Sequence, residues 1–114
     1  MTKDLKQLCF HVPIIPFAQF ENHAKSDNLR LYEAVAEAVD QLVEKYDPFD
    51  AEKMKEWAAK PVDLKEQSLQ ALYLRTEQIT TLDNFADLAS KALQQSVTRA
   101  AVLRSAIIEY LRKE

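Results

Sequence analysis

The chain has 114 residues, 47% of them hydrophobic, and a formal net charge of -3. This length suits one compact domain, and the apolar fraction is too high for a disordered chain. Glycine is absent, which excludes glycine-rich phosphate loops and dinucleotide-binding turns, because these need a residue without Cβ where the backbone approaches a phosphate. We therefore expect left-handed turns to fall on Asn or Asp.

The single cysteine, Cys9, excludes an internal disulfide framework and favours a reducing cytoplasm. No apolar run approaches the roughly 20 residues that a membrane span needs. The charged N-terminus, residues 1–6, is not followed by the apolar region of a signal peptide. The sequence thus predicts a cytoplasmic protein with no membrane partner.

The first predicted element is a strand over residues 7–12, in which apolar side chains occupy every second position. One face of this strand holds Leu8, Phe10 and Val12, and the other holds Gln7, Cys9 and His11. Pro13 and Pro16 should end the strand and begin a helix. The apolar positions of this helix are Phe17, Phe20 and Ala24.

A second helix is predicted over residues 29–46, because apolar residues recur there at helical spacing. They are Leu31, Ala34, Val35, Ala38, Val39, Leu42 and Val43. The preceding residues, Ser26-Asp27-Asn28, interrupt the apolar pattern and offer N-cap side chains.

Residues 47–66 are expected to connect two halves of the chain, and Asp47-Pro48 indicates a turn at their start. A short helix is predicted over 51–59, with Asp50 as its N-cap and Pro61 beyond its end. Its expected buried residues are Met54, Trp57 and Ala58.

The second half repeats the order of the first. Alternation predicts a strand over residues 69–76, with Leu72 and Leu74 on one face. Thr80 or Thr81 could cap a following helix with apolar Leu82, Phe85, Leu88, Ala89 and Ala92, and Thr98 could cap the last helix. That last helix would bury Val102, Leu103, Ala106, Ile107, Tyr110 and Leu111, with Lys113 placed favourably for its dipole.

One strand with two helices leaves both strand edges unpaired, so the two strands should pair with each other. The predicted fold class is mainly α-helical with a two-stranded antiparallel ribbon. Its parts would be residues 1–46 and 68–114 as two strand-helix-helix copies and 47–67 as the connector, all within one compact domain. An all-α four-helix bundle remains the alternative if 69–76 is helical.

The pattern resembles the ribbon-helix-helix DNA-binding family of the Arc and methionine repressors. The resemblance rests on "FHVP" at 10–13, "LYLRT" at 72–76, "LRLYEAVAEAVDQLV" at 29–43 and "TRAAVLRSAIIEYL" at 98–111. Two copies in one chain resemble the tandem members, such as the relaxosome accessory protein of F-like conjugative plasmids, to whose junction "EKYDPF" at 44–49 is also similar. The resemblance implies a tandem pseudo-dimer whose ribbon enters the DNA major groove.

By position, the resemblance implies a set of base-contacting residues. They are Gln7, Cys9, His11, Ala71, Tyr73 and Arg75. Arg75 could pair with guanine and Gln7 with adenine, whereas Cys9 and Ala71 could make only apolar contacts. Implied phosphate contacts lie at the N-termini of the second helix of each copy. They are Asn28, Leu29, Thr98 and Arg99.

Charge is distributed unevenly along the chain. Residues 68–114 carry six basic and five acidic side chains, whereas residues 1–46 carry five and seven. Cys9, His11 and His23 have no recognisable metal-ligand spacing, and no base is placed to activate Cys9. We therefore expect no metal, no cofactor and no enzymatic activity.

The resulting hypothesis is sequence-specific binding of double-stranded DNA, as a transcriptional repressor or as part of a plasmid or phage nucleoprotein complex. The sequence leaves open self-association along DNA or a separate protein partner. The alternative function is an acidic protein-protein interaction module, antitoxin-like or regulatory, that keeps the fold with little DNA binding.

Overall fold

A computed structural model describes residues 5–59 and 66–112 of the chain. Its described elements follow one another as β1 (Leu5–Pro13), α1 (Ile14–Ser26), α2 (Leu31–Lys45), α3 (Ala51–Ala59), β2 (Gln67–Arg75), α4 (Thr76–Leu93) and α5 (Arg99–Arg112). The expected fold class, mainly α-helical with a two-stranded antiparallel ribbon, is confirmed. The all-α alternative is wrong, because residues 67–75 pair with β1 as a strand.

The ribbon is a complete antiparallel ladder with Cys9 opposite Ala71 at its centre, Leu5 opposite Arg75 at one end and Pro13 opposite Gln67 at the other. Side chains alternate between its two faces, as the strand period requires. The inner face consists of Phe10, Val12, Leu72 and Leu74, each at most 2% exposed. The predicted alternation of both strands is therefore confirmed.

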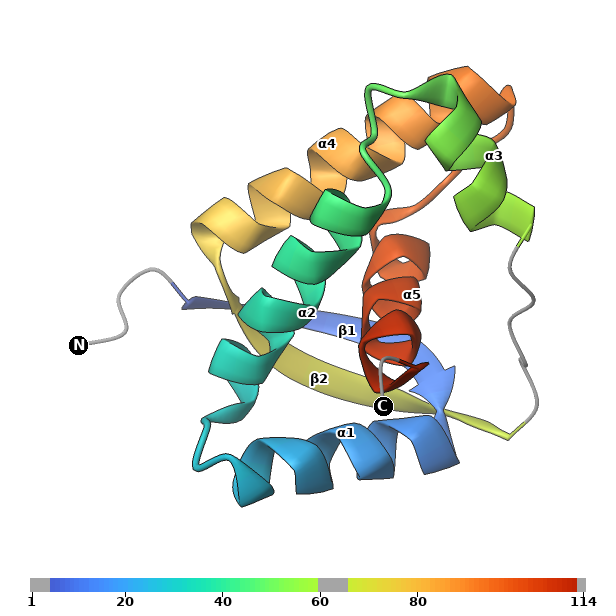
Figure 1. Ribbon diagram of the computed structural model, residues 1–114. Helices are drawn as coiled ribbons and strands as arrows, with labels where there is room; N and C mark the ends of the chain where they lie inside the picture. The colour runs from blue at the N-terminus through green and yellow to red at the C-terminus, as the bar shows by residue number, and fades with distance from the viewer. Residues whose placement is uncertain (1–4, 60–65, 113–114) are drawn as a thin grey trace.

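Four helices enclose this inner face (Figure 1). α1 and α4 continue directly from β1 and β2 and leave opposite ends of the ribbon. α2 packs on β2, α5 packs on β1, and α2 and α5 pack on each other. The largest fully buried side chains of the shared core include Phe20, Phe85, Leu42, Met54, Leu82, Leu103 and Ile107.

The start of α4 differs from the prediction. β2 ends at Arg75, and α4 begins at Thr76. The hydroxyl groups of Thr80 and Thr81 donate to the carbonyls of Thr76 and Glu77, one turn earlier, so these threonines lie inside the helix rather than at its cap. The expected strand 69–76 is thus shifted, and the predicted connector 47–67 loses Gln67 to β2.

The turn between α1 and α2 also differs from the predicted cap. Arg30, not Ser26-Asp27-Asn28, is the N-cap of α2, and its backbone N–H donates to Glu33 Oε1 at 2.9 Å. Asn28 does adopt a left-handed conformation (φ 57°). The restriction of such turns to Asn or Asp is wrong, because Glu66 (φ 52°) and Gln94 (φ 55°) adopt them too.

The connector helix α3 contacts the core through a single row of side chains along one side of the helix. Asp50 Oδ1 accepts from the backbone N–H of Glu52 at 3.0 Å, which confirms the predicted cap. Met54 is buried, and the Trp57 indole N–H donates to Ser105 Oγ at 2.6 Å. The adjacent Ala58 is exposed, contrary to the prediction, because so short a helix turns only one stripe inward. The roles expected of Pro61 and Lys113 fall outside the described residues.

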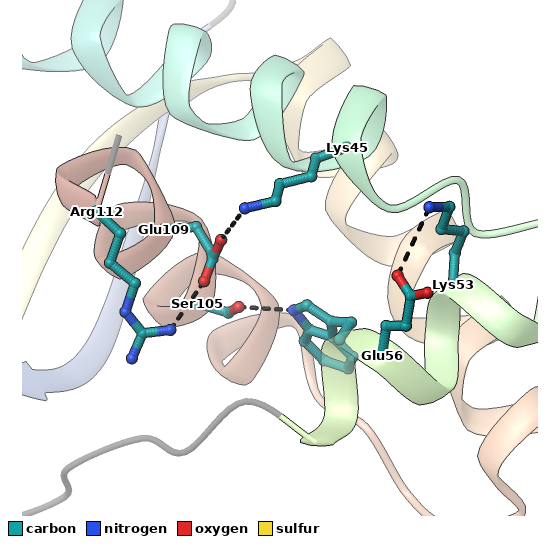
Figure 2. A network of polar contacts seen from close by, with 7 residues as sticks. Lys45, Lys53, Glu56, Ser105, Glu109 and Arg112 are labelled. Carbon is teal, nitrogen blue, oxygen red and sulfur yellow. Dashed lines mark hydrogen bonds and ion pairs between the residues drawn. The ribbon is translucent and has the colours of Figure 1, made fainter. Parts of the chain in front are cut away.

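Glu109 is 7% exposed and lies between two cations (Figure 2). Its carboxylate accepts from Lys45 Nζ at 3.0 Å and from Arg112 Nη1 at 2.9 Å. Burial of the carboxylate works to raise its pKa, but the hydrogen bonds and charges of Lys45 and Arg112 together hold the pKa of Glu109 below its ordinary value. The ionised carboxylate therefore stabilises the folded chain.

This pairing predicts acid sensitivity. A carboxyl group whose pKa is lower in the folded state stabilises it above the unfolded pKa of about 4.3, and the stabilisation is lost as pH falls through the folded value. We expect the free energy of unfolding in urea to decrease from about pH 5 to about pH 3, and to decrease less in Glu109→Gln. Glu56→Gln, which removes an exposed ion pair with Lys53, is the matched control. If the free energy of unfolding depended on pH in Glu109→Gln as it does in the wild-type protein, the stabilising role of the ionised Glu109 carboxylate would be contradicted.

Candidate nucleic-acid interface

The outer face of the ribbon carries the predicted base-contacting residues. All six, Gln7, Cys9, His11, Ala71, Tyr73 and Arg75, are exposed. The register brings Gln7 opposite Tyr73 and Cys9 opposite Ala71, so the two halves of the chain contribute to one continuous surface. Leu69, opposite His11, is 62% exposed and adds an apolar position that the sequence prediction did not include. The local cause of this exposure is the strand alternation, which turns every second side chain away from the core.

One end of the ribbon is basic. Arg75 ends β2, and its guanidinium Cζ lies 5.4 Å from the ring centroid of Tyr32, in the first turn of α2. Arg30 caps the same helix, and Lys6 lies opposite Leu74, next to Arg75 in the ladder. We call Lys6, Arg30, Tyr32 and Arg75 the Arg75 end.

The cations of the Arg75 end are available to a ligand. Across residues 5–59 and 66–112, neither Lys6, Arg30 nor Arg75 forms an ion pair with a carboxylate. Of the acidic side chains that the structure describes, Glu33 accepts from the Arg30 backbone, and Glu77 is exposed two residues after Arg75. The positive end of the α2 dipole adds to the potential of the three cations.

At the opposite end of the ribbon, the arginine side chains form hydrogen bonds within the protein. We call His11, Leu69, Arg99 and Arg104 the His11 end. Arg104 Nη1 donates to the His11 carbonyl at 2.8 Å. Arg99 makes two hydrogen bonds of 2.7 Å to the Asp83 carboxylate, and this pairing lowers the pKa of Asp83 and raises that of Arg99. Asp83 neutralises the charge of Arg99, whereas the carbonyl that accepts from Arg104 is uncharged. With one of its two arginines neutralised, the His11 end presents less positive charge than the Arg75 end with its three cations.

The predicted phosphate-contacting residues are placed at the two helix-helix turns. The backbone N–H of Asn28 donates to the Lys25 carbonyl and that of Leu29 to the Ala24 carbonyl, both closing α1. An anion at this turn would meet instead the first-turn N–H groups of α2, at Leu31 and Tyr32, because such groups have no intrahelical partner.

At the second turn, Thr98 is the N-cap of α5. Its Oγ1 accepts from the Ala101 backbone N–H at 3.1 Å, as predicted for a cap. Arg99 is the first residue of the helix, and its guanidinium is held by Asp83. The first-turn N–H groups of Arg99 and Ala100 remain at the positive end of the α5 dipole.

The sequence prediction did not include Lys6, Arg30 and Tyr32, which the structure places at the Arg75 end. Lys6 falls on the same face of β1 as the inward-facing Phe10 and Val12 and lies opposite Leu74, yet it is exposed because it is near the open end of the ribbon. The contact between Tyr32 and Arg75 joins residues from different halves of the chain. The only local signal was that Arg30 immediately precedes an amphipathic helix, where a cation does not normally favour the dipole.

No family model matches the chain, and the searches of curated proteins and of solved structures give no significant match. Within the described residues, no cluster of three or more His, Cys, Asp or Glu side chains could hold a metal ion. Among the helices described, none is both long and apolar enough to cross a membrane. The functional assignment therefore depends on the geometry of the ribbon and its two ends.

Proposed function

We propose that this chain is a cytoplasmic protein that binds double-stranded DNA by placing the outer face of the β1–β2 ribbon in the major groove. The groove is wide enough for a two-stranded ribbon, and its base edges distinguish all four base pairs. The observation that carries the proposal is the exposed surface formed jointly by Gln7, Tyr73 and Arg75, beside cations that pair with no carboxylate of residues 5–59 and 66–112. Its biological role would be transcriptional repression or assembly of a plasmid or phage nucleoprotein complex.

We take the two strand-helix-helix segments as ribbon-helix-helix units that pair within one chain. Three features support this reading. Both strands have nine residues and pair end to end, each continues directly into a helix, and the left-handed residues Asn28 and Gln94 follow corresponding helices. Because the two units differ in sequence, the preferred DNA site should be asymmetric rather than palindromic.

Phosphate binding in this proposal involves both the predicted turns and the Arg75 end. The first turns of α2 and α5 would face the DNA backbone on the two sides of the groove, next to the predicted residues Asn28, Leu29, Thr98 and Arg99. The N–H donors would be those of Leu31 and Tyr32 in α2 and those of Arg99 and Ala100 in α5. Lys6 and Arg30 would add charge at one side only.

The alternative is an acidic protein-binding module, antitoxin-like or regulatory, on the same fold. It is favoured by the net charge of -3 and by exposed apolar side chains at Ile15 (63%), Leu69 (62%) and Tyr73 (54%). Titration of the protein with a mixed-sequence duplex at about 50 mM salt separates the two. Saturable binding is expected for the proposed function. If no saturable binding were detected at this salt concentration, DNA binding would be excluded and the protein-binding module would be the remaining function.

A further inference from the structure

Tyr32 contacts Arg75 with its aromatic ring. The distance of 5.4 Å from Arg75 Cζ to the ring centroid lies within the roughly 6 Å over which a ring attracts a cation. Tyr32 is half-buried, and its neighbours Leu29 and Leu31 pack against the core. The ring is thus held by the body of the protein, whereas Arg75 is exposed at the end of a strand.

This contact has no counterpart at the His11 end. The residue of α5 that corresponds to Tyr32 is Ala100, the second of its helix, and the residue of β1 that corresponds to Arg75 is Pro13, the last of its strand. The two ends of the ribbon therefore differ in their chemistry: one carries an arginine held on a ring, and the other carries neither partner.

We infer that Tyr32 is a positioning residue that orients the Arg75 guanidinium toward a base edge, which makes the Arg75 end the specificity-determining half of the DNA site. The inference rests on the proposed DNA-binding function. A planar guanidinium pairs with O6 and N7 of guanine through two hydrogen bonds, which demands a defined orientation. A ring contact restricts the side chain before DNA binds, so less conformational freedom is lost on binding.

The test begins with a duplex that the wild-type protein selects from a pool of random sequences. The measured quantity is the discrimination ratio, the Kd for a mixed-sequence duplex divided by the Kd for the selected duplex. We expect Arg75→Ala to lower this ratio about tenfold or more, and Tyr32→Leu to lower it about 2- to 5-fold. Tyr32→Phe, which keeps the ring, should retain the wild-type ratio, and Tyr32→Leu should add nothing in the Arg75→Ala background.

Two controls distinguish positioning from a general structural effect. Lys91→Ala removes a cation that is paired with Asp87 on α4, far along the helix from the ribbon, and should leave the ratio unchanged. In the absence of DNA, the NMR shift of the Arg75 Nε–H should change in Tyr32→Leu but not in Tyr32→Phe, because only the former loses the ring. Thermal unfolding identifies any variant that fails to fold, and Tyr32→Met then replaces Tyr32→Leu.

The outcomes separate the inference from the function on which it rests. A wild-type ratio in Tyr32→Leu, or an Arg75 Nε–H shift that does not respond to removal of the ring, would overturn the positioning role while DNA binding stands. If the wild-type protein enriches no duplex from the pool and does not bind mixed DNA at low salt, the proposed function itself fails. Loss of discrimination in Tyr32→Leu with rescue by Tyr32→Phe supports the inference.

Discussion

The Kd of the protein for mixed-sequence duplex DNA should rise about 100-fold when the salt concentration is raised from about 50 to about 200 mM. Each phosphate neutralised by a bound cation releases condensed counterions, and the logarithm of the binding constant falls by roughly 0.9 per phosphate per decade of salt. About four phosphate contacts, a number suited to the Arg75 end and two helix N-termini, give this change. Isothermal or fluorescence titration over the salt series measures it.

Variants at the Arg75 end make the salt prediction residue-specific. Arg30→Ala and Lys6→Ala should each reduce the salt slope by about one, because each removes one phosphate-neutralising charge. Lys91→Ala, which removes a 73% exposed side chain remote from the ribbon, should leave the slope unchanged. A slope that is flat, or that responds equally to all three variants, would contradict a localised DNA contact.

Truncation of the inner face should cause the largest loss of stability. Phe10 is 2% exposed and packs edge-to-face on Phe17, with ring centroids 6.4 Å apart. Removing a buried phenyl group costs its transfer free energy together with the cavity that remains, so Phe10→Ala should lower the free energy of unfolding by about 3–5 kcal/mol. In a domain of this size the melting temperature should fall by roughly 12 °C or more.

Cys9 provides the matched control for this prediction, since it is the neighbouring residue on the exposed face. Cys9→Ala should change the free energy of unfolding by no more than about 0.5 kcal/mol, as is usual for surface positions. Denaturation in urea measures both variants. If Phe10→Ala and Cys9→Ala lowered the free energy of unfolding by similar amounts, Phe10 and Cys9 would not lie on opposite faces of β1, and the structure of the ribbon would be contradicted.

The sequence was sufficient to predict the features that arise from local periodicity. The alternation in β1 and β2, the apolar stripe of α2 and the left-handed Asn28 were all visible because each depends on neighbours in the chain or on a residue's own conformational preference. Pairing of the two strands followed from the cost of leaving their edges open.

Other features could not be predicted because they depend on contacts between distant residues. Thr80 and Thr81 resemble helix caps, but the strand runs straight into α4 at Thr76, and the two hydroxyl groups bond within the helix. The two ribbon ends differ in positive charge because some arginines pair with carboxylates and others do not. Asp83 meets Arg99 across a turn between helices, whereas Arg75 meets the Tyr32 ring from the other half of the chain.

The chain's only cysteine offers the most direct test of the central claim, that the outer face of the ribbon enters DNA. Cys9 is exposed and lies opposite Ala71 at the centre of the ladder. A ribbon seated in the major groove would cover its thiol, so saturating duplex at low salt should slow alkylation of Cys9 by iodoacetamide about tenfold or more. Alkylation should return to the rate of the free protein at high salt, where the complex dissociates. An unchanged rate of alkylation while DNA is bound would contradict the proposed interface.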